Sequence, residues 1–206
     1  MDPDDHHLFV SLGCATENLV QAAGAQGLRA EARFEPAQAA VRVTLAPGTP
    51  QSTALYVDIP ARQCTRGDFD GHPLTTGELK QLAAAATSPG VQCHLFTERA
   101  ALERILSFVI EGNTAQIRDP AFVRELKQWL RFNAADAVRL GDGLYTAASG
   151  NPTAPAWLGR LLFDLFFTPG AEADRYAQQV RSAAGVAVFV AEQADAAHWV
   201  AVGRAY

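Results

Sequence analysis

The chain has 206 residues, 49% of them apolar, and a formal net charge of −5 with a pI near 5.5. A chain of this length and composition can bury a core as one large domain or two small ones, which excludes general disorder. The acidic balance leaves no broad basic surface for nucleic acid, so any site for an anion must be local.

The two ends of the chain resemble each other. Residues 8–15, LFVSLGCA, match residues 198–205, HWVAVGRA, at a constant offset of roughly 190 positions. The matched pairs are Phe9 with Trp199, Val10 with Val200, Leu12 with Val202, Gly13 with Gly203, and Ala15 with Ala205. A match this short also arises by chance. If it is real, the chain is a piece of a longer protein with two related halves, cut as a second copy of the first helix begins.

The first third of the chain reads as a helix followed by two strands. An apolar stripe follows the first copy of the repeat and predicts a helix that ends at Gly27. LRAEARFEP and AAVRVTLAP then alternate apolar and polar residues around a Pro/Ala turn, which predicts a hairpin or two edge strands. A linker rich in Gly, Pro and Ser, APGTPQST, closes this region near residue 53.

Three helices and one strand are predicted in the middle of the chain. Thr75 stands three residues ahead of Glu78, a capping box, and an apolar helical face follows it. The sequence VQCHLF alternates as a strand does. Thr97 opens an amphipathic helix expected to end near Gly112, and a third helix begins at Asp119 and Pro120.

The last quarter contains a loop, an apolar segment and a strand. Residues 145–155 are rich in Gly, Ser, Pro and Ala, as loops are. The segment AWLGRLLFDLFF is strongly apolar, and its aromatic residues are expected in a core or an interface rather than around a ligand. GVAVFVA has the composition of a strand buried on both faces. Helices alternating with a few strands predict a mixed α and β class.

The residues with the clearest chemical potential lie between 59 and 96. If the segment around Ala61 is helical, Arg62 and Arg66 lie four residues apart on one face and their guanidinium groups can converge on one phosphate. Cys64 and Thr65 stand between them, and the hydroxyl of Thr65 can add a donor. The alternative is a pair of solvated arginines near Asp68 and Asp70.

Other candidate sites are weaker. The polar cluster that contains His6 and His7 can attract a metal, but a frayed and solvated N-terminus is the better interpretation, so no metal site is expected. His94 and His198 stand singly on apolar segments and are expected to pack. Cys64, between two arginines, is either a redox-active thiol or a small packed residue. The sequence contains no GxGxxG or GxxxxGK[ST] motif.

The order of motifs in residues 59–96 resembles the FMN-binding start of the nitroreductase family, which has Arg-x-Ser-x-(Arg/Lys) followed later by Pro-Ser-x-x-Asn-x-Gln-Pro-Trp-x-Phe. In this chain Arg62, Cys64 and Arg66 occupy the first motif, and Gly90, Gln92 and Phe96 fall on the Asn, the Gln and the final Phe of the second. Three departures stand out: Cys64 replaces Ser, Gly90 replaces Asn, and Cys93–His94 replaces Pro-Trp.

A second block, DPAFVRELKQWLRFNAADAVRLGDGL, resembles the Asp-Pro-x-Phe…Trp-x-Arg-Phe…Asp-Gly-Leu segment of the Acg-type nitroreductase-like flavoproteins. In that subfamily two nitroreductase-like halves are fused in one chain. The resemblance therefore implies an α+β nitroreductase-like fold, a mixed sheet flanked by helices, truncated at both ends. Residues 1–53 would be the C-terminal part of a first half, and residues 54–206 a second half that lacks its last helix and strand.

The resemblance also implies a function. We expect an FMN-binding oxidoreductase that takes electrons from NAD(P)H and passes them to nitroaromatic, quinone or similar acceptors, with cofactor-binding residues Arg62, Cys64, Thr65, Arg66, Gly90 and Gln92. Flavin chemistry requires few catalytic side chains. The three departures favour an alternative, a flavin-sequestering protein with little or no turnover. A third possibility is a structural half whose own site has degraded.

Partners and location follow from composition and from the resemblance. Three widely spaced cysteines match no disulfide or zinc pattern and suit a reducing compartment, so we expect a cytoplasmic protein unless a missing N-terminus directs export. The apolar runs are shorter than the ~20 residues of a membrane span. The expected partners are a small-molecule substrate and a second nitroreductase-like half, in the same chain or in a homodimer.

Overall fold

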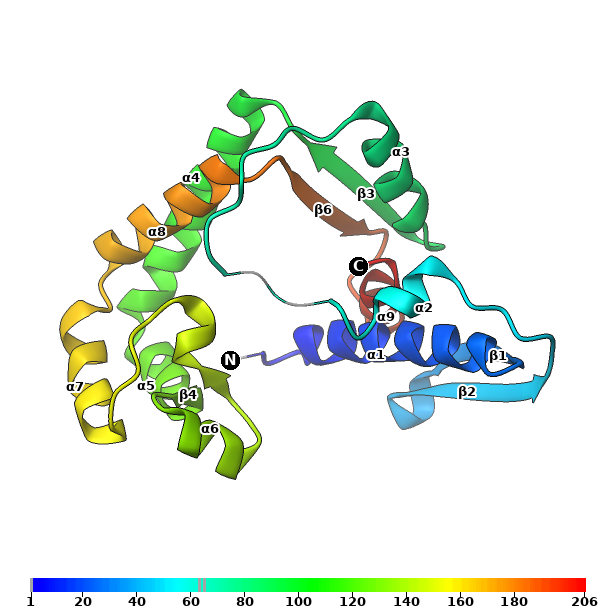
Figure 1. Ribbon diagram of the computed structural model, residues 1–206, viewed down its shortest axis with the longest axis horizontal. Coiled ribbons are helices and arrows are strands. Elements are labelled where there is room, and N and C mark those ends of the chain that lie inside the picture. Colours follow the sequence, from blue (N-terminus) through cyan, green and yellow to red (C-terminus); the bar gives the residue numbers. More distant parts are fainter. Residues whose placement is uncertain (1, 63, 65) are drawn as a thin grey trace. The chain divides into compact units, whose positions relative to one another are not determined.

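The computed structural model describes residues 2–62, 64 and 66–206 (Figure 1). Helices and strands are mixed, which confirms the class expected from the sequence. The described residues form two compact units. We call them the glycine-crossing unit (residues 2–62, 75–95 and 187–206) and the pocket unit (residues 64, 66–74 and 96–186). Each unit is assembled from segments that are distant in the sequence.

The glycine-crossing unit is built on the packing of α1 (His6–Ala25) against α9 (Ala196–Ala205). The two helices meet at Gly13 and Gly203. A Cβ atom on Gly13 would lie 2.2 Å from the carbonyl oxygen of Val200, and one on Gly203 would lie 1.9 Å from that of Val10. Real Cβ atoms do not approach other atoms so closely, so only glycine permits this contact between the two backbones.

The contacts between α1 and α9 join residues that the resemblance between the two ends of the chain pairs with each other. Gly13 meets Gly203, and the rings of Phe9 and Trp199 lie with their centroids 6.2 Å apart. Reciprocal contacts of this kind are typical of a two-fold pair. Nearby, Arg204 donates two hydrogen bonds of 3.0 Å to Glu17. The segments that resemble each other in sequence therefore pack on each other, and both are helical.

The predicted hairpin is confirmed. Strand β1 (Leu28–Glu35) pairs antiparallel with β2 (Ala40–Pro47) through a single-turn helix, η1 (Pro36–Gln38). Residues alternate in burial along β1, as the sequence pattern required. Gly27 has a φ of +76° between α1 and β1, a conformation that glycine adopts without steric cost. Its predicted role as the end of the first helix is therefore confirmed.

Two short helices and a two-stranded sheet complete this unit. Helix α2 (Ala54–Asp58) is capped by Thr53, and α3 (Thr76–Ala85) begins with the predicted capping box of Thr75 and Glu78. The predicted strand β3 (Val91–Phe96) pairs with β6 (Val186–Ala191). The two strands point in opposite directions in Figure 1, and the amide of Glu192 donates to the carbonyl of Gly90 at 2.9 Å.

The expectation that β6 is buried on both faces is wrong for the described chain. No residue of β6 is fully buried, and Val190 is 45% exposed. Apolar composition reports how well a strand tolerates burial. It does not report whether a covering layer is present.

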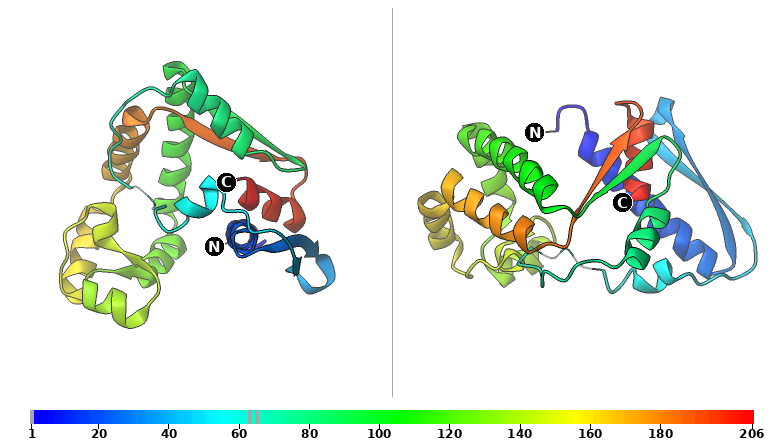
Figure 2. Two further views of the ribbon diagram at one scale, coloured as in Figure 1. Left: turned by 45° about the vertical axis from the view of Figure 1, so that its right-hand side comes forward. Right: turned by 90° about the horizontal axis from the view of Figure 1, so that it is seen from above.

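The pocket unit is organised around α4 (Arg99–Arg118) and α8 (Pro169–Ser182), which lie side by side in both views of Figure 2. Leu102 and Leu106 of α4 are almost completely buried, as their helical spacing predicted. Two hydrogen bonds of 2.9 Å from Arg181 to Glu103 link the helices at the surface. Apolar burial therefore holds the pair together, and the exposed ion pair contributes little.

The remaining elements of the pocket unit are short. They are α5 (Pro120–Trp129), β4 (Leu130–Arg131), α6 (Ala134–Leu140), β5 (Leu144–Tyr145), the single-turn helix η2 (Thr146–Ser149) and α7 (Ala156–Phe166). Asp119 caps α5 as predicted. Strands β4 and β5 form a parallel pair. No helix in the described residues has both the length and the apolar composition to cross a membrane.

The predicted end of the helix at Gly112 is wrong. Helix α4 continues through Gly112 to Arg118. A glycine inside a helix costs only about 1 kcal/mol relative to alanine, which the packing of Leu102 and Leu106 readily offsets.

Candidate functional site

The described residues of the predicted phosphate-binding segment are not helical. Helix α2 ends at Asp58, and the described residues Arg62, Cys64 and Arg66 lie in irregular backbone. Pro60 explains the early end, because proline has no amide hydrogen to continue the helical bonding. The condition for placing the two arginines one helical turn apart is therefore not met. Thr65, the fourth residue predicted here, lies outside the described residues.

Arg62 and Arg66 belong to different units. Arg62 lies in the glycine-crossing unit, where its positive charge acts on the thiol of Cys14. Burial raises the pKa of Cys14, and a hydrogen bond with its own backbone and the charge of Arg62 oppose that rise in part. Cys64 and Arg66 lie in the pocket unit, and all three predicted side chains are exposed.

Gly90 and Gln92 flank the start of β3. Gly90 has a φ of +74°, and a Cβ atom there would lie 3.0 Å from Cδ2 and 3.1 Å from Nε2 of His198. Glycine thus provides the space that this imidazole occupies. Gln92 is exposed on the strand.

His198 is oriented by an acidic partner that the sequence reading missed. Asp195 caps α9 by accepting the backbone N–H of His198 at 2.9 Å, and its Oδ1 also lies 2.8 Å from Nδ1 of the same residue. These two bonds, the backbone one first, lower the pKa of Asp195. The predicted packing of His198 is consistent with its largely buried ring, whose side chain is 21% exposed. The sequence signal for this pair is an N-cap residue, Asp195, three positions before His198.

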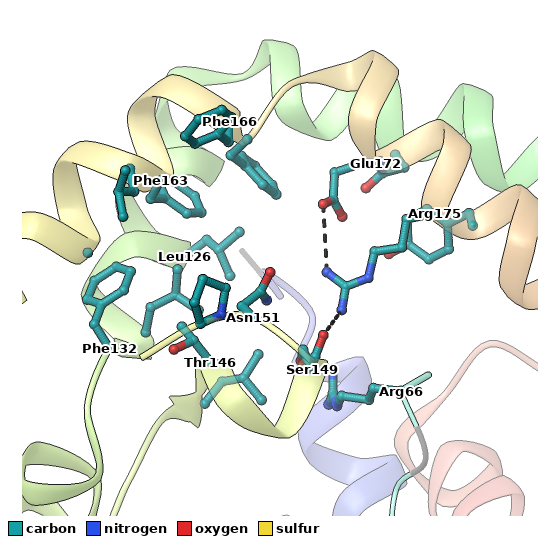
Figure 3. A pocket seen from close by; sticks show the side chains of 18 of the residues that line it. Arg66, Leu126, Phe132, Thr146, Ser149, Asn151, Phe163, Phe166, Glu172 and Arg175 are labelled. Atoms are coloured by element: carbon teal, nitrogen blue, oxygen red, sulfur yellow. Dashed lines mark hydrogen bonds and ion pairs between the residues drawn. The ribbon is translucent and has the colours of Figure 1, made fainter. Parts of the chain in front are cut away.

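A cavity of about 570 Å³ lies within the pocket unit (Figure 3). It is bordered by α4, α5, α7, α8 and the loop after η2. The apolar lining residues are Phe122, Leu126, Leu130, Phe132, Leu144, Pro152, Ala154, Gly159, Leu162, Phe163, Phe166 and Phe167, and the polar ones include Arg66, Asn113, Glu172 and Arg175. Pockets of this size and composition commonly bind small organic molecules. Of the predicted site residues that the structure describes, Arg66 alone is among those that line it.

Residues 119–144, the segment that resembles the Acg-type motif, form one wall of the cavity. Arg131, whose side chain is 10% exposed, donates to Asp142 at 2.7 Å. Gly143 has a φ of +73°, and a Cβ atom there would lie 2.3 Å from the carbonyl oxygen of Trp129. These contacts hold β4 beside β5, so the side chains of Leu130, Phe132 and Leu144 line the cavity. The residues of this block therefore help to shape the cavity.

Close packing shapes the aromatic end of the cavity. A Cβ atom on Gly159 of α7 would lie 2.4 Å from the ring of the buried residue Phe132, so glycine is needed for α7 to approach it. Phe163 and Phe167 stack with their ring centroids 4.5 Å apart and an interplanar angle of 17°. The result is a wall of aromatic carbon atoms.

The opposite end of the cavity is polar. Figure 3 shows Arg66 and Arg175 near Ser149, away from Phe132 and Phe163. Arg175 donates to the backbone carbonyl of Ser149 and lies 3.9 Å from Glu172. Nδ2 of Asn113, another lining residue, is buried without a hydrogen-bond partner in the described structure.

Comparison with known proteins gives partial matches. Two curated proteins named "Putative NAD(P)H nitroreductase", from the CDC 1551/Oshkosh and ATCC 25618/H37Rv strains of Mycobacterium tuberculosis, are each 29% identical to this chain over 134 residues. The match covers 62% of this chain and 38% of each relative, so the chain aligns with well under half of their length. No family model and no solved structure matches the chain.

Proposed function

We propose that this chain is part of an FMN-dependent oxidoreductase of nitroreductase type, which transfers electrons from NAD(P)H to nitroaromatic, quinone or similar acceptors. The observation that supports it most directly is the 134-residue similarity to the two mycobacterial proteins. The resemblance of residues 59–96 and 119–144 to nitroreductase motifs supports the same assignment.

The donor chemistry of the predicted residues fits a flavin mononucleotide. Arg62 and Arg66 are exposed guanidinium groups suited to a phosphate, and Gln92 offers an exposed carboxamide for a ring edge. Cys64 and Thr65 belong to the same predicted set, and Gly90 has no side chain to hinder close approach of its backbone. When bound, FMN accepts a hydride from NAD(P)H and passes electrons on, so the protein has only to bind and orient it.

The proposal includes two related halves in the intact protein, with a pseudo-dimer in one chain or a homodimer as the assembly. The reciprocal contacts of Gly13 with Val200 and of Gly203 with Val10 support it. In such an arrangement the helices that carry the repeat form the contact between the halves.

Anaerobic reduction tests the function. The purified protein, saturated with FMN, is mixed with NADPH without oxygen, and the flavin absorbance is followed. Prompt bleaching, followed by recovery when a nitroaromatic compound or a quinone is added, is the expected result. Bound flavin that does not bleach would instead support the flavin-sequestering alternative, and failure to bind FMN at all would reject both.

A further inference from the structure

We propose that the cavity of the pocket unit is a binding site for a flat aromatic molecule that carries a carboxylate group. This inference goes beyond the proposed function, because it assigns a ligand to a cavity whose apolar lining is not part of the predicted flavin site. It rests on the separation of the cavity into an aromatic end and a donor end (Figure 3).

The aromatic end selects a flat ring. The stacked rings of Phe163 and Phe167 line the cavity, and the buried ring of Phe132 is held there by Gly159. Aromatic rings pack on one another in stacked or edge-on arrangements, which a saturated ligand matches less well. A volume of about 570 Å³ is sufficient for a two-ring molecule.

The donor end selects a hydrogen-bond acceptor. Among the described residues, no hydrogen bond or ion pair engages the guanidinium of Arg66. Elsewhere in the lining, Nδ2 of Asn113 is another donor for which the described structure shows no partner. The lining contains two guanidinium groups, those of Arg66 and Arg175, and one carboxylate, that of Glu172. One positive charge of the lining is therefore not balanced by a negative one. A carboxylate supplies both the charge and the acceptor atoms.

Two probes of the same shape test the inference. The protein, freed of flavin, is titrated by calorimetry with 2-naphthoate and with its neutral counterpart 2-naphthylmethanol. We expect both to bind saturably, with 2-naphthoate about tenfold tighter because of the charge-assisted contact with the arginines. Equal affinity for the two probes, or no saturable binding of 2-naphthoate, would overturn the proposal.

Two variants assign the selectivity to the two ends of the cavity. Arg66→Gln is expected to weaken 2-naphthoate by about tenfold and to leave 2-naphthylmethanol unchanged, because it removes charge without removing an internal contact. Phe163→Ala is expected to weaken both probes by about tenfold, because it removes ring contacts. Phe108→Ala, at a phenylalanine that is 72% exposed and does not line the cavity, is the matched control and should change neither.

Arg62→Ala separates this proposal from the flavin proposal. Arg62 lies in the glycine-crossing unit and does not line the cavity. Binding of 2-naphthoate should therefore be the same in Arg62→Ala as in the unaltered protein, whatever happens to FMN. A matched loss of 2-naphthoate affinity in Arg62→Ala and Arg66→Gln would show that the probe occupies the flavin site and would contradict the assignment.

Discussion

The two units pack by opposite means. In the glycine-crossing unit α1 and α9 meet backbone to backbone at Gly13 and Gly203, which have no side chains to separate them. In the pocket unit large aromatic side chains meet at angles that leave a cavity of about 570 Å³. A contact without side chains leaves no room for a ligand, whereas an incompletely filled aromatic core does. The comparison indicates that the contact between α1 and α9 contributes stability, whereas the aromatic packing of the pocket unit leaves space that a ligand can fill.

The largest effect should come from Gly203→Ala. The new methyl group would lie 1.9 Å from the carbonyl oxygen of Val10, and a backbone atom has little freedom to move. We expect a loss of roughly 3 kcal/mol in the free energy of unfolding, measured with urea, and a similar loss for Gly13→Ala. Gly24→Ala, in α1 like Gly13→Ala, is the control, because its methyl group would make only an ordinary contact at 3.7 Å. Equal midpoints for Gly203→Ala and Gly24→Ala would refute the tight crossing.

Gly159→Ala should have a smaller effect, of about 2 kcal/mol. Its methyl group would lie 2.4 Å from the ring of Phe132, and a side chain yields more readily than a backbone. Displacement of that ring should also lower the affinity for 2-naphthoate. The control is Gly170→Ala in α8, where the methyl group would meet no atom within 4 Å. If Gly159→Ala unfolds at the same urea concentration as Gly170→Ala, the account of α7 is wrong.

Gly112→Ala should stabilise the pocket unit. Gly112 is exposed in the interior of α4, and its methyl group would have open space around it. Alanine reduces the freedom of the unfolded chain, so we expect a gain of about 0.5–1 kcal/mol. A loss of stability would mean that α4 is interrupted at this residue, as the sequence alone suggested.

The smallest effect should appear at low pH in the glycine-crossing unit. The pKa of Asp195 is lowered in the folded state, by the backbone amide of His198 first and by its ring second. Because the pKa of Asp195 is lower in the folded state, its ionised carboxylate stabilises the fold at a pH above the ordinary pKa of 3.8. This stabilisation is lost as the pH falls through the pKa of the folded state. Asp195→Ala should therefore slightly lower the urea midpoint of unfolding at pH 7. Below pH 4 the midpoint should fall less steeply with decreasing pH in the variant than in the unaltered protein. If the urea midpoints of the two proteins change with pH in parallel, the ionised carboxylate of Asp195 does not stabilise the start of α9.

The sequence predicted the features that are encoded locally. The capping box of Thr75 and Glu78, the start of a helix at Asp119 and the alternation of residues 28–47 each act over a few residues, and all three are confirmed. The end of α2 before Pro60 is a local feature too. Arg62 and Arg66 share a face only if the helix continues past this proline, which has no amide hydrogen to donate.

Other features depend on residues far apart in the chain. The resemblance between the two ends of the chain pairs Gly13 with Gly203, but nothing in the sequence indicates that they touch. The cavity combines residues from Arg66 to Gln179, and most of them are ordinary apolar residues in the sequence. Several of the aromatic residues of 156–167 border the cavity, and residue type alone does not distinguish such a position from one in a filled core. Their arrangement follows from tertiary packing, which residue type and spacing do not specify.

The most direct test of the flavin account is a titration of FMN into the unaltered protein and into Arg62→Ala, with quenching of flavin fluorescence as the signal. We predict that Arg62→Ala weakens FMN binding by about 1–3 kcal/mol, because a charge-assisted contact to the phosphate is lost. Arg33→Ala, at an exposed arginine of the hairpin, serves as the control and should bind FMN as the unaltered protein does. Identical FMN affinity in all three proteins would contradict the account.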